Sequence, residues 1–203
     1  MANGQEKLNI KPTDTENALQ KHNKLLLHCC CAPCATAVIE RILPNIKHLT
    51  LYYYNPNTYP KSEYDKRFAE LEKLAKIYNL ELVCETYDEN EFFTAVCGKE
   101  SDREGGSRCE VCIGLRLKKT QEYALENGYD AFTTTLSVSP HKNAGFINTF
   151  GRSLSDENCH YIDADFKKAN GFLRSIKLAD EYGLYRQNYC GCKFSQRGDG
   201  NDD

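Results

Sequence analysis

The sequence has no long apolar run. None of its 203 residues belongs to a stretch of about 18 apolar residues, the length that a membrane-spanning helix needs. Its first 23 residues are polar and lack the apolar core of a secretory signal, so we expect a cytoplasmic protein without membrane contact. Internal repeats and long linkers are also absent. The length suits one domain with a sizeable core rather than two.

Positive charge is not in excess. The chain has 26 Lys and Arg against 29 Asp and Glu, a net charge of −3, which excludes attraction of the whole molecule to nucleic acid. An RNA site would therefore need a local basic patch. The C-terminal third could supply one, although such a run is more often a solvated helix face. Its cations are Arg152, Lys167, Lys168, Arg174, Lys177, Arg186, Lys193 and Arg197.

Cysteine, in contrast, is abundant. The chain has 11, an odd number that fits a disulfide scaffold poorly, and without a secretory signal their abundance indicates metal or redox chemistry. Cys84, Cys97 and Cys159 are interpreted as small buried apolar residues. The other eight fall into three tight groups, which scattered core cysteines would not do.

Apolar runs alternate with helical patterns along the chain, which is typical of an α/β fold with a parallel sheet. We predict a three-layer sandwich with a mainly parallel five-stranded sheet. Residues 1–23 are expected to be disordered, 24–194 to form one catalytic domain, and 195–203 to be a flexible tail. Strands are predicted at 24–28, 48–54, 81–87, 131–139 and 160–166, and helices at 35–43, 62–78, 109–127, 143–155 and 168–182. Periodicity does not reveal the strand order.

The first thiol group comprises Cys29, Cys30, Cys31 and Cys34, directly after the first strand and at the start of its helix. Ligands of parallel sheets bind beyond the carboxyl ends of strands. The positive end of a helix dipole there lowers thiol pKa and favours the thiolate that metals bind.

Two further groups follow. Cys109 and Cys112 are three residues apart at a helix start, where Ser107 and Glu110 suggest a capping box. Cys190 and Cys192 flank a glycine, so they could ligate a metal or pair with each other. A closed zinc site would need only four of these thiols and would leave the rest unexplained. A four-cysteine iron–sulfur cluster plus a second thiolate site accounts better for eight.

Other side chains near strand ends could contact RNA. Phosphate or base contacts are expected from the loop after the fourth strand, although a plain solvated loop would carry the same residues: Ser137, Ser139, His141, Lys142 and Asn143. An aromatic stretch after the second strand could stack on an unpaired base, but it would equally suit a core: Tyr52, Tyr53, Tyr54 and Tyr59.

Taken together, several segments of residues 24–193 resemble the QueH epoxyqueuosine reductases. They are HCCCAPC, then YYYNPN followed by YP, EY and R, then CEVC, TTLSVSPHKN, DFKK followed by GF, and LYRQNYCGC. The resemblance implies an oxidoreductase of tRNA processing, which reduces wobble-position epoxyqueuosine to queuosine in the final step of queuosine biosynthesis. It also implies a PP-loop-like, Rossmann-like fold. Cysteines replace the phosphate-binding Ser-Gly-Gly loop of that fold, so nucleotide hydrolysis is not expected.

By resemblance, Cys30, Cys31, Cys109 and Cys112 match the ligands of a 4Fe–4S cluster. Cys190 and Cys192 match a redox-active disulfide pair, and Cys29 is a bystander. A second division is open, in which Cys31, Cys109, Cys112 and Cys190 hold the cluster while Cys30, Cys34 and Cys192 hold a mononuclear iron. It is favoured by the spacing of Cys30 and Cys34 and by the difficulty of turning adjacent Cys30 and Cys31 toward one cluster.

The expected partners are tRNA carrying epoxyqueuosine and an electron donor that the sequence does not identify. Candidate proton donors to the departing oxygen are Asp163, Asp165 and His28, although His28 fits a satisfied core histidine better. Two other functions stay open. An iron–sulfur tRNA sulfur-transfer enzyme would need an ATP loop that is missing here, and a zinc-binding RNA adaptor would contain zinc without iron.

Overall fold

The computed structural model describes residues 13–196 of the chain. Its centre is a five-stranded sheet in the order β3-β2-β1-β4-β5, and every neighbouring pair is parallel. The strands are β1 (Lys24–His28), β2 (His48–Tyr53), β3 (Glu81–Cys84), β4 (Ala131–Thr134) and β5 (His160–Tyr161). The predicted three-layer α/β sandwich with a parallel sheet is thereby confirmed.

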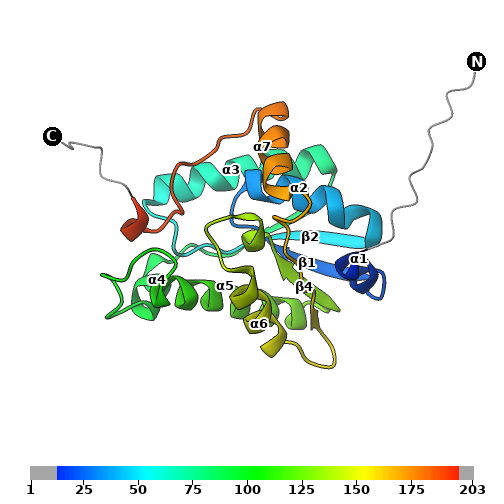
Figure 1. Ribbon diagram of the computed structural model, residues 1–203, viewed down its shortest axis with the longest axis horizontal. Coiled ribbons are helices and arrows are strands. Elements are labelled where there is room, and N and C mark those ends of the chain that lie inside the picture. Colours follow the sequence, from blue (N-terminus) through cyan, green and yellow to red (C-terminus); the bar gives the residue numbers. More distant parts are fainter. Residues whose placement is uncertain (1–12, 197–203) are drawn as a thin grey trace, which may run out of the picture.

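Helices cover both faces of this sheet (Figure 1). One layer contains α2 (Ala32–Ile42), α3 (Lys61–Tyr78) and α7 (Gly171–Glu181). The opposite layer contains α4 (Glu89–Ala95), α5 (Ser107–Glu126) and α6 (Ala144–Ser153). Shorter elements are α1 (Asp14–Leu19) and the 3-10 turns η1 (Leu43–Asn45), η2 (Thr135–Val138) and η3 (Lys193–Ser195).

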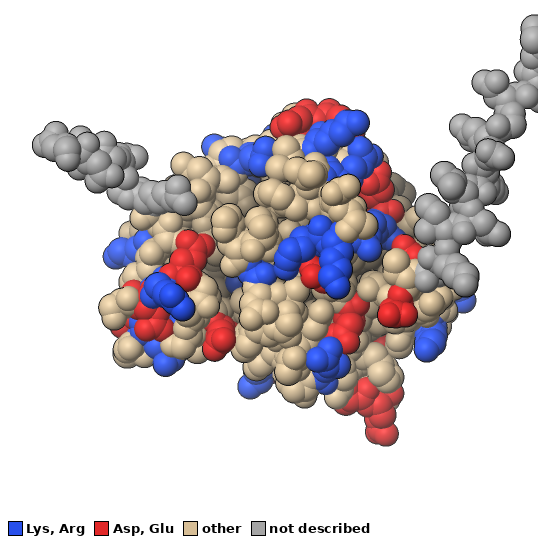
Figure 2. Space-filling view, viewed as in Figure 1, with Lys and Arg blue, Asp and Glu red and all other residues tan. Residues whose placement is uncertain are grey.

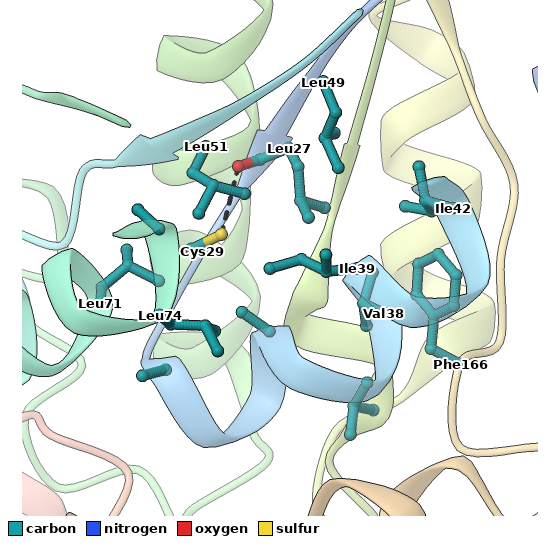
Figure 3. Packing of buried hydrophobic residues seen from close by; sticks show 14 of the residues in the cluster. Leu27, Cys29, Val38, Ile39, Ile42, Leu49, Leu51, Leu71, Leu74 and Phe166 are labelled. Carbon is teal, nitrogen blue, oxygen red and sulfur yellow. Dashed lines mark hydrogen bonds between the residues drawn. The ribbon is translucent and has the colours of Figure 1, made fainter. Parts of the chain in front are cut away.

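The main core lies between the sheet and the layer of α2 and α3. The leucines of β1 are fully buried, because a central parallel strand is covered on both faces. Figure 3 shows Ile39, Leu51 and Leu74 meeting there around Cys29, whose thiol donates to the carbonyl of Leu27 at 3.4 Å. Each such fully buried leucine contributes about 1.5–3 kcal/mol to folding. Cys29 is therefore a core residue.

The order of the strands predicts where a ligand-binding cleft lies. The chain runs outward from β1 through β2 to β3, then crosses back to β4 on the other side of β1. Ligands in such sheets bind where the direction reverses, beyond the carboxyl ends of the two central strands. Here that edge lies after His28 and Thr134, and the first thiol group follows His28 directly.

The N-terminal prediction needs correction. Residues 13–23 are ordered rather than disordered, since Thr13 and Glu16 form a capping box that starts α1. Leu19 is buried against the core, and the hydroxyl of Thr15 donates to the carbonyl of Asp163 at 2.8 Å. At the other end, η3 includes Ser195. The predicted disorder of residues 1–12 and 197–203 lies outside the described residues.

The predicted start of the helix of Cys109 is also corrected. That helix, α5, begins at Ser107, so Ser107 cannot be its cap. Asp102 performs that role instead, because its carboxylate accepts from the Ser107 hydroxyl at 2.5 Å and from the Arg108 amide at 3.0 Å. A loop carboxylate five residues before the helix thus replaces the expected local box.

Four strands end earlier than predicted, β2 by one residue and β3, β4 and β5 by more. β4 stops at Thr134 because the hydroxyl of that residue accepts from the Leu136 amide and starts the η2 turn. β3 stops at Cys84, which is exposed, as is Cys97, so the prediction that both are buried is wrong. Cys159 is buried as predicted. No helix within residues 13–196 is long and apolar enough to span a membrane.

Candidate thiol and metal centre

Three thiols meet at the entrance to α2. Cys30 follows β1, Cys31 is the N-cap of α2 and Cys34 lies in its first turn. Their sulfurs all lie within 4.8 Å of one another, a spacing that suits a shared metal ion. The Sγ atoms of Cys30 and Cys31 are 3.8 Å apart, although the side chains of adjacent residues were expected to diverge. The extended backbone of Cys31 (φ −170°, ψ 162°) allows both to turn toward Cys34.

One of these three thiols is more acidic than the other two. Hydrogen bonds from Cys31 and Cys34 hold the pKa of Cys30 well below its ordinary value. The same hydrogen bonds raise the pKa of Cys31 to about 12 and that of Cys34 well above the ordinary value. Cys30 is therefore the thiolate of this group and the other two are donors. The Gln187 amide also donates to Cys31 Sγ at 2.9 Å.

The four thiols of the two later groups line one pocket. Cys109 and Cys112 come from the first turns of α5, and Cys190 and Cys192 from the chain after α7. Burial raises the pKa of Cys112 to about 11. Burial also raises the pKa of Cys109. The Gly105 amide donates to the Cys109 sulfur at 3.2 Å, and this hydrogen bond opposes the rise in pKa. All four are free thiols in the structure.

The two thiol groups line adjoining pockets, of about 660 Å³ and 1120 Å³ when counted up to their open mouths. The first pocket holds the four later thiols, and the second holds Cys30 and Cys34. Cys190 lines both, and so do two cations, Arg116 and Lys142. The predicted site residues are thus brought to one cleft, apart from Cys31, which lies buried behind Cys30.

The two cations are placed among the thiols. The Arg116 guanidinium is buried and donates to the Cys112 carbonyl at 3.1 Å. Burial alone would lower the pKa of Lys142, but the neighbouring sulfurs of Cys190, Cys30 and Cys34 outweigh it and raise that pKa. Two positive charges therefore lie beside the sulfurs, where they would offset the negative charge of thiolates that bind a soft metal.

Sequence reasoning missed Arg116 and Gln187. The available signal for Arg116 was its position four residues after Cys112, on the same side of a helix. Lys142 was proposed only as a phosphate or base contact. In the structure its neighbours His141 and Ser139 line the same cleft, and so does Asn143, whose side chain also caps α6 by accepting from the Phe146 amide.

The candidate proton donors are not in the cleft. His28 is fully buried between Thr134 Oγ1 (2.8 Å) and the Tyr54 carbonyl (3.1 Å), and burial lowers its pKa to about 4. It is thus the satisfied core histidine that we expected as the simpler interpretation. Asp163 pairs with Arg152 and Asp165 with Lys167, and neither carboxylate lines either pocket.

Three tyrosines of the aromatic stretch are part of the core rather than a stacking platform, whereas Tyr59 is half-buried. Tyr52, Tyr53 and Tyr54 are buried and bonded to Glu85, the Tyr64 carbonyl and Glu91 respectively.

The C-terminal cations are largely paired. Arg152, Lys167, Arg174 and Lys177 each face a carboxylate. Figure 2 shows positive charge over α7 and the segment before it, interspersed with acidic patches. Arg186 lines the larger pocket, whereas Arg197 lies outside the described residues.

The fold and this thiol-lined cleft define a class: PP-loop-like α/β proteins with a cysteine-rich centre at the carboxyl edge of the sheet. A solved structure with a similar fold is the "U34-tRNA thiolase NcsA from Methanococcus maripaludis with its [4Fe-4S] cluster", at a TM-score of 0.53 and 13% identity. The match covers 91% of this chain and 68% of the thiolase.

Sequence comparison identifies the family. The family model "Epoxyqueuosine reductase QueH" matches residues 25–198. The epoxyqueuosine reductase QueH of Streptococcus pyogenes is 38% identical over 185 residues, covering 88% of this chain and 72% of that protein. The Thermotoga maritima protein of the same name is 35% identical, covering 84% and 89%. The chain therefore belongs to the QueH family of epoxyqueuosine reductases, which confirms the resemblance and the assignment as an oxidoreductase.

Proposed function

We propose that this chain reduces epoxyqueuosine to queuosine at the wobble position of tRNA, with an iron–sulfur cluster and redox-active thiols. The convergence of six thiols from three separate segments on one cleft, around Arg116 and Lys142, with Cys31 next to Cys30 and Cys34, carries this proposal. Family membership names the reaction, and the cleft supplies groups that can perform it. Family membership also favours epoxide reduction over sulfur transfer or a zinc-binding adaptor.

The thiols suit iron. Thiolates are the usual ligands of a 4Fe–4S cluster, which takes four, and the cleft offers that number with charges to offset them. We assign Cys31, Cys109 and Cys112 as ligands, because both predicted divisions share them, and Cys30 as the fourth. Cys34, within 4.8 Å of Cys30 and Cys31, would help to hold a second iron. Bound iron would supply single electrons and a Lewis acid in the cleft.

Cys190 and Cys192 would supply the reducing equivalents. As their two thiols form a disulfide, they release two electrons and two protons. The epoxide loses both carbon–oxygen bonds, a carbon–carbon double bond forms, and the oxygen leaves as water with those two protons. Cys190 lines both pockets, so its sulfur can face the substrate as well as the later thiols. A donor outside this chain then reduces the disulfide by thiol exchange or electron transfer.

Lys142 would relay one of these two protons: its Nζ atom donates to the departing oxygen and regains a proton from the thiols. It lines both pockets, and the neighbouring sulfurs raise its pKa, so it is charged. An alkoxide is far more basic than an amine, so a lysine whose pKa is raised still donates to it. Asp163 and Asp165 lack this access.

The larger pocket suits the modified base. Its walls combine apolar surfaces from Pro33, Phe172 and Ile176 with polar groups from Ser139 and Asn188. Flat apolar surface beside hydrogen-bonding groups is how proteins hold an unstacked RNA base. A splayed wobble nucleotide would thus reach Cys190 from this side.

The first test is anaerobic purification with measurement of iron, acid-labile sulfide and zinc, followed by reaction with dithionite and tRNA containing epoxyqueuosine. We expect iron with sulfide and conversion of the nucleoside to queuosine, detected by mass spectrometry of digested tRNA. Four irons per chain would indicate the cluster alone, and five the cluster with a second iron. Zinc without sulfide and no queuosine would contradict the proposal, and a thiolated nucleoside would indicate sulfur transfer.

A further inference from the structure

The segment that carries Cys190 and Cys192 has no regular structure of its own. Between Tyr182 and Cys192 the described chain forms neither helix nor strand, so no ladder of backbone hydrogen bonds holds the two thiols in place. Their position must come from side chains of other elements. The contacts of this segment lead to one residue of α3, Arg67.

Arg67 is buried, with 2% of its surface exposed, and it binds the thiol segment through its guanidinium. Nη1 donates to the Cys190 carbonyl at 3.0 Å and Nη2 to the Tyr189 carbonyl at 3.3 Å. The guanidinium also lies over the Tyr189 ring, 5.1 Å from its centroid. A planar fork of donors can hold two successive carbonyls at once, which a lysine ammonium cannot do with the same geometry.

The Arg67 guanidinium is in turn fixed by Glu63. Its Nε donates to Glu63 one turn earlier on α3, at 2.7 Å, and the Tyr185 hydroxyl donates to the same carboxylate at 3.2 Å. The loop before α3 adds a further tie, since the Tyr59 amide donates to the Gly191 carbonyl at 2.8 Å. Glu63 and Arg67 belong to the EY and R part of the sequence pattern, to which the reaction itself assigns no role.

Gly191 fits this arrangement tightly. Its φ of +121° disfavours residues with a side chain, and a Cβ atom there would lie 2.7 Å from Arg67 Nη1. The glycine between the two cysteines therefore lets the guanidinium approach the backbone closely. Any side chain at this position would displace either the guanidinium or the thiol segment.

We infer that Arg67 is a positioning residue that holds Cys190 and Cys192 against the pocket of Cys109 and Cys112. Arg67 also lines the larger pocket, but its donors bind the Cys190 and Tyr189 carbonyls and Glu63, so it acts through the thiol segment. This inference deepens the proposed function and rests on it for the role of the pair. The contacts of Arg67 lie within this chain and involve neither metal nor tRNA.

The test is the reactivity of individual thiols in the reduced, metal-free full-length chain. Iodoacetamide labelling read by peptide mass spectrometry gives a rate for each cysteine. Arg67→Gln should raise the rates of Cys190 and Cys192 about tenfold or more, as expected from loss of hydrogen bonds to a charged group. The rate of Cys29 should stay unchanged. Arg67→Lys should give an intermediate increase, and Gly191→Ala should reproduce the effect with the guanidinium still present.

The matched control is Arg174→Gln. Arg174 forms a comparable pair with Glu40 on the surface and contacts none of the thiols, so the labelling rates should equal those of the unaltered chain. Circular dichroism melting shows which variants fold. If Arg67→Gln does not fold, Arg67→Lys and Gly191→Ala decide the question. Folded variants with unaltered labelling at both cysteines would overturn the inference.

Kinetics of the metal-loaded enzyme separate positioning from substrate contact. We expect Arg67→Gln to lower kcat by about tenfold or more with little change in the KM for tRNA, since the thiols would spend less time in place. A raised KM with unaltered labelling would mean that Arg67 binds substrate instead. If the unaltered chain itself shows no reduction, the proposed function fails while the labelling result stands.

Discussion

The two thiol groups of this protein are built in different ways. Cys30, Cys31 and Cys34 lie within five residues, and the end of β1 and the start of α2 place them together. Cys109 and Cys112 meet Cys190 and Cys192 across some eighty residues of sequence, through a segment without helix or strand. The first group is local and rigid, whereas the second depends on side chains such as Arg67 and Asp102.

This difference suits a division of labour. Thiols on the edge of a sheet and the start of a helix hold one geometry, as a metal ligand should. A thiol pair that forms and breaks a disulfide must move during each turnover, and an irregular segment permits such movement at small cost. The following experiments compare the two groups directly.

The largest effect is expected from Cys190→Ser compared with Cys34→Ser. Under our assignment Cys190→Ser keeps four irons and the sulfide but loses all multiple turnover, because one sulfur of the redox pair is gone. Cys34→Ser keeps the cluster and loses only a fifth iron. Iron and sulfide analysis with queuosine quantification measures both. A Cys190→Ser protein without cluster would support the alternative division, and one with undiminished turnover would exclude a catalytic pair.

Lys142→Met should lower kcat for queuosine formation by about 10²- to 10⁴-fold, the usual contribution of a positioned general acid. Iron and sulfide content should be retained, because the lysine is not a ligand. Lys193→Met, a substitution of another cation near the thiols, provides the comparison and should change kcat little. If both variants behave alike, bulk positive charge rather than proton donation explains the effect of Lys142.

The pH dependence of labelling should separate the two groups in the metal-free chain. The pKa of Cys30 is lowered, so its thiolate is present below the ordinary thiol pKa and its iodoacetamide rate reaches a plateau at lower pH. The pKa of Cys112 is raised to about 11, so its rate should still increase above pH 9. Rates for each cysteine between pH 6 and 10 test this. A single common profile would refute the hydrogen-bond network around Cys30.

Cys29→Ala should have the smallest effect. It removes one buried sulfur from the core next to the first group, which costs about 1 kcal/mol of unfolding free energy. Cluster content and kcat should stay unchanged, because the Cys29 side chain faces the core while Cys30 faces the cleft. Urea denaturation and iron analysis provide the measurements. Loss of iron would show that Cys29 is a ligand rather than a bystander.

Much of the fold was predictable because it depends on local patterns. Continuous apolar runs such as KLLLH indicate strands buried on both faces, and β1 begins and ends as predicted. The elements that prediction missed or misplaced depend on polar contacts. The capping box of α1 was visible in the sequence but was overlooked, whereas the cap of α5 by Asp102 comes from a loop that no helix-start rule covers.

The candidate site was predictable as a list of thiols but not as an arrangement. The number and spacing of the cysteines, without a secretory signal, indicate soft-metal chemistry. Which thiols share a pocket could not be predicted. Adjacent Cys30 and Cys31 face each other only because of the backbone at the start of α2, and Asp163 and Asp165 proved to be surface partners of Arg152 and Lys167.

The sequence by itself determined the class of chemistry, the parallel α/β architecture and the family, since these follow from residue types and their spacing. Tertiary structure alone decided which side chains surround the thiols. Arg116, Lys142 and Arg67 come from different elements, and nothing in local sequence directs them to one cleft. Their charges act over a few ångströms, whereas the folding of the sheet and its crossovers brings them within that range.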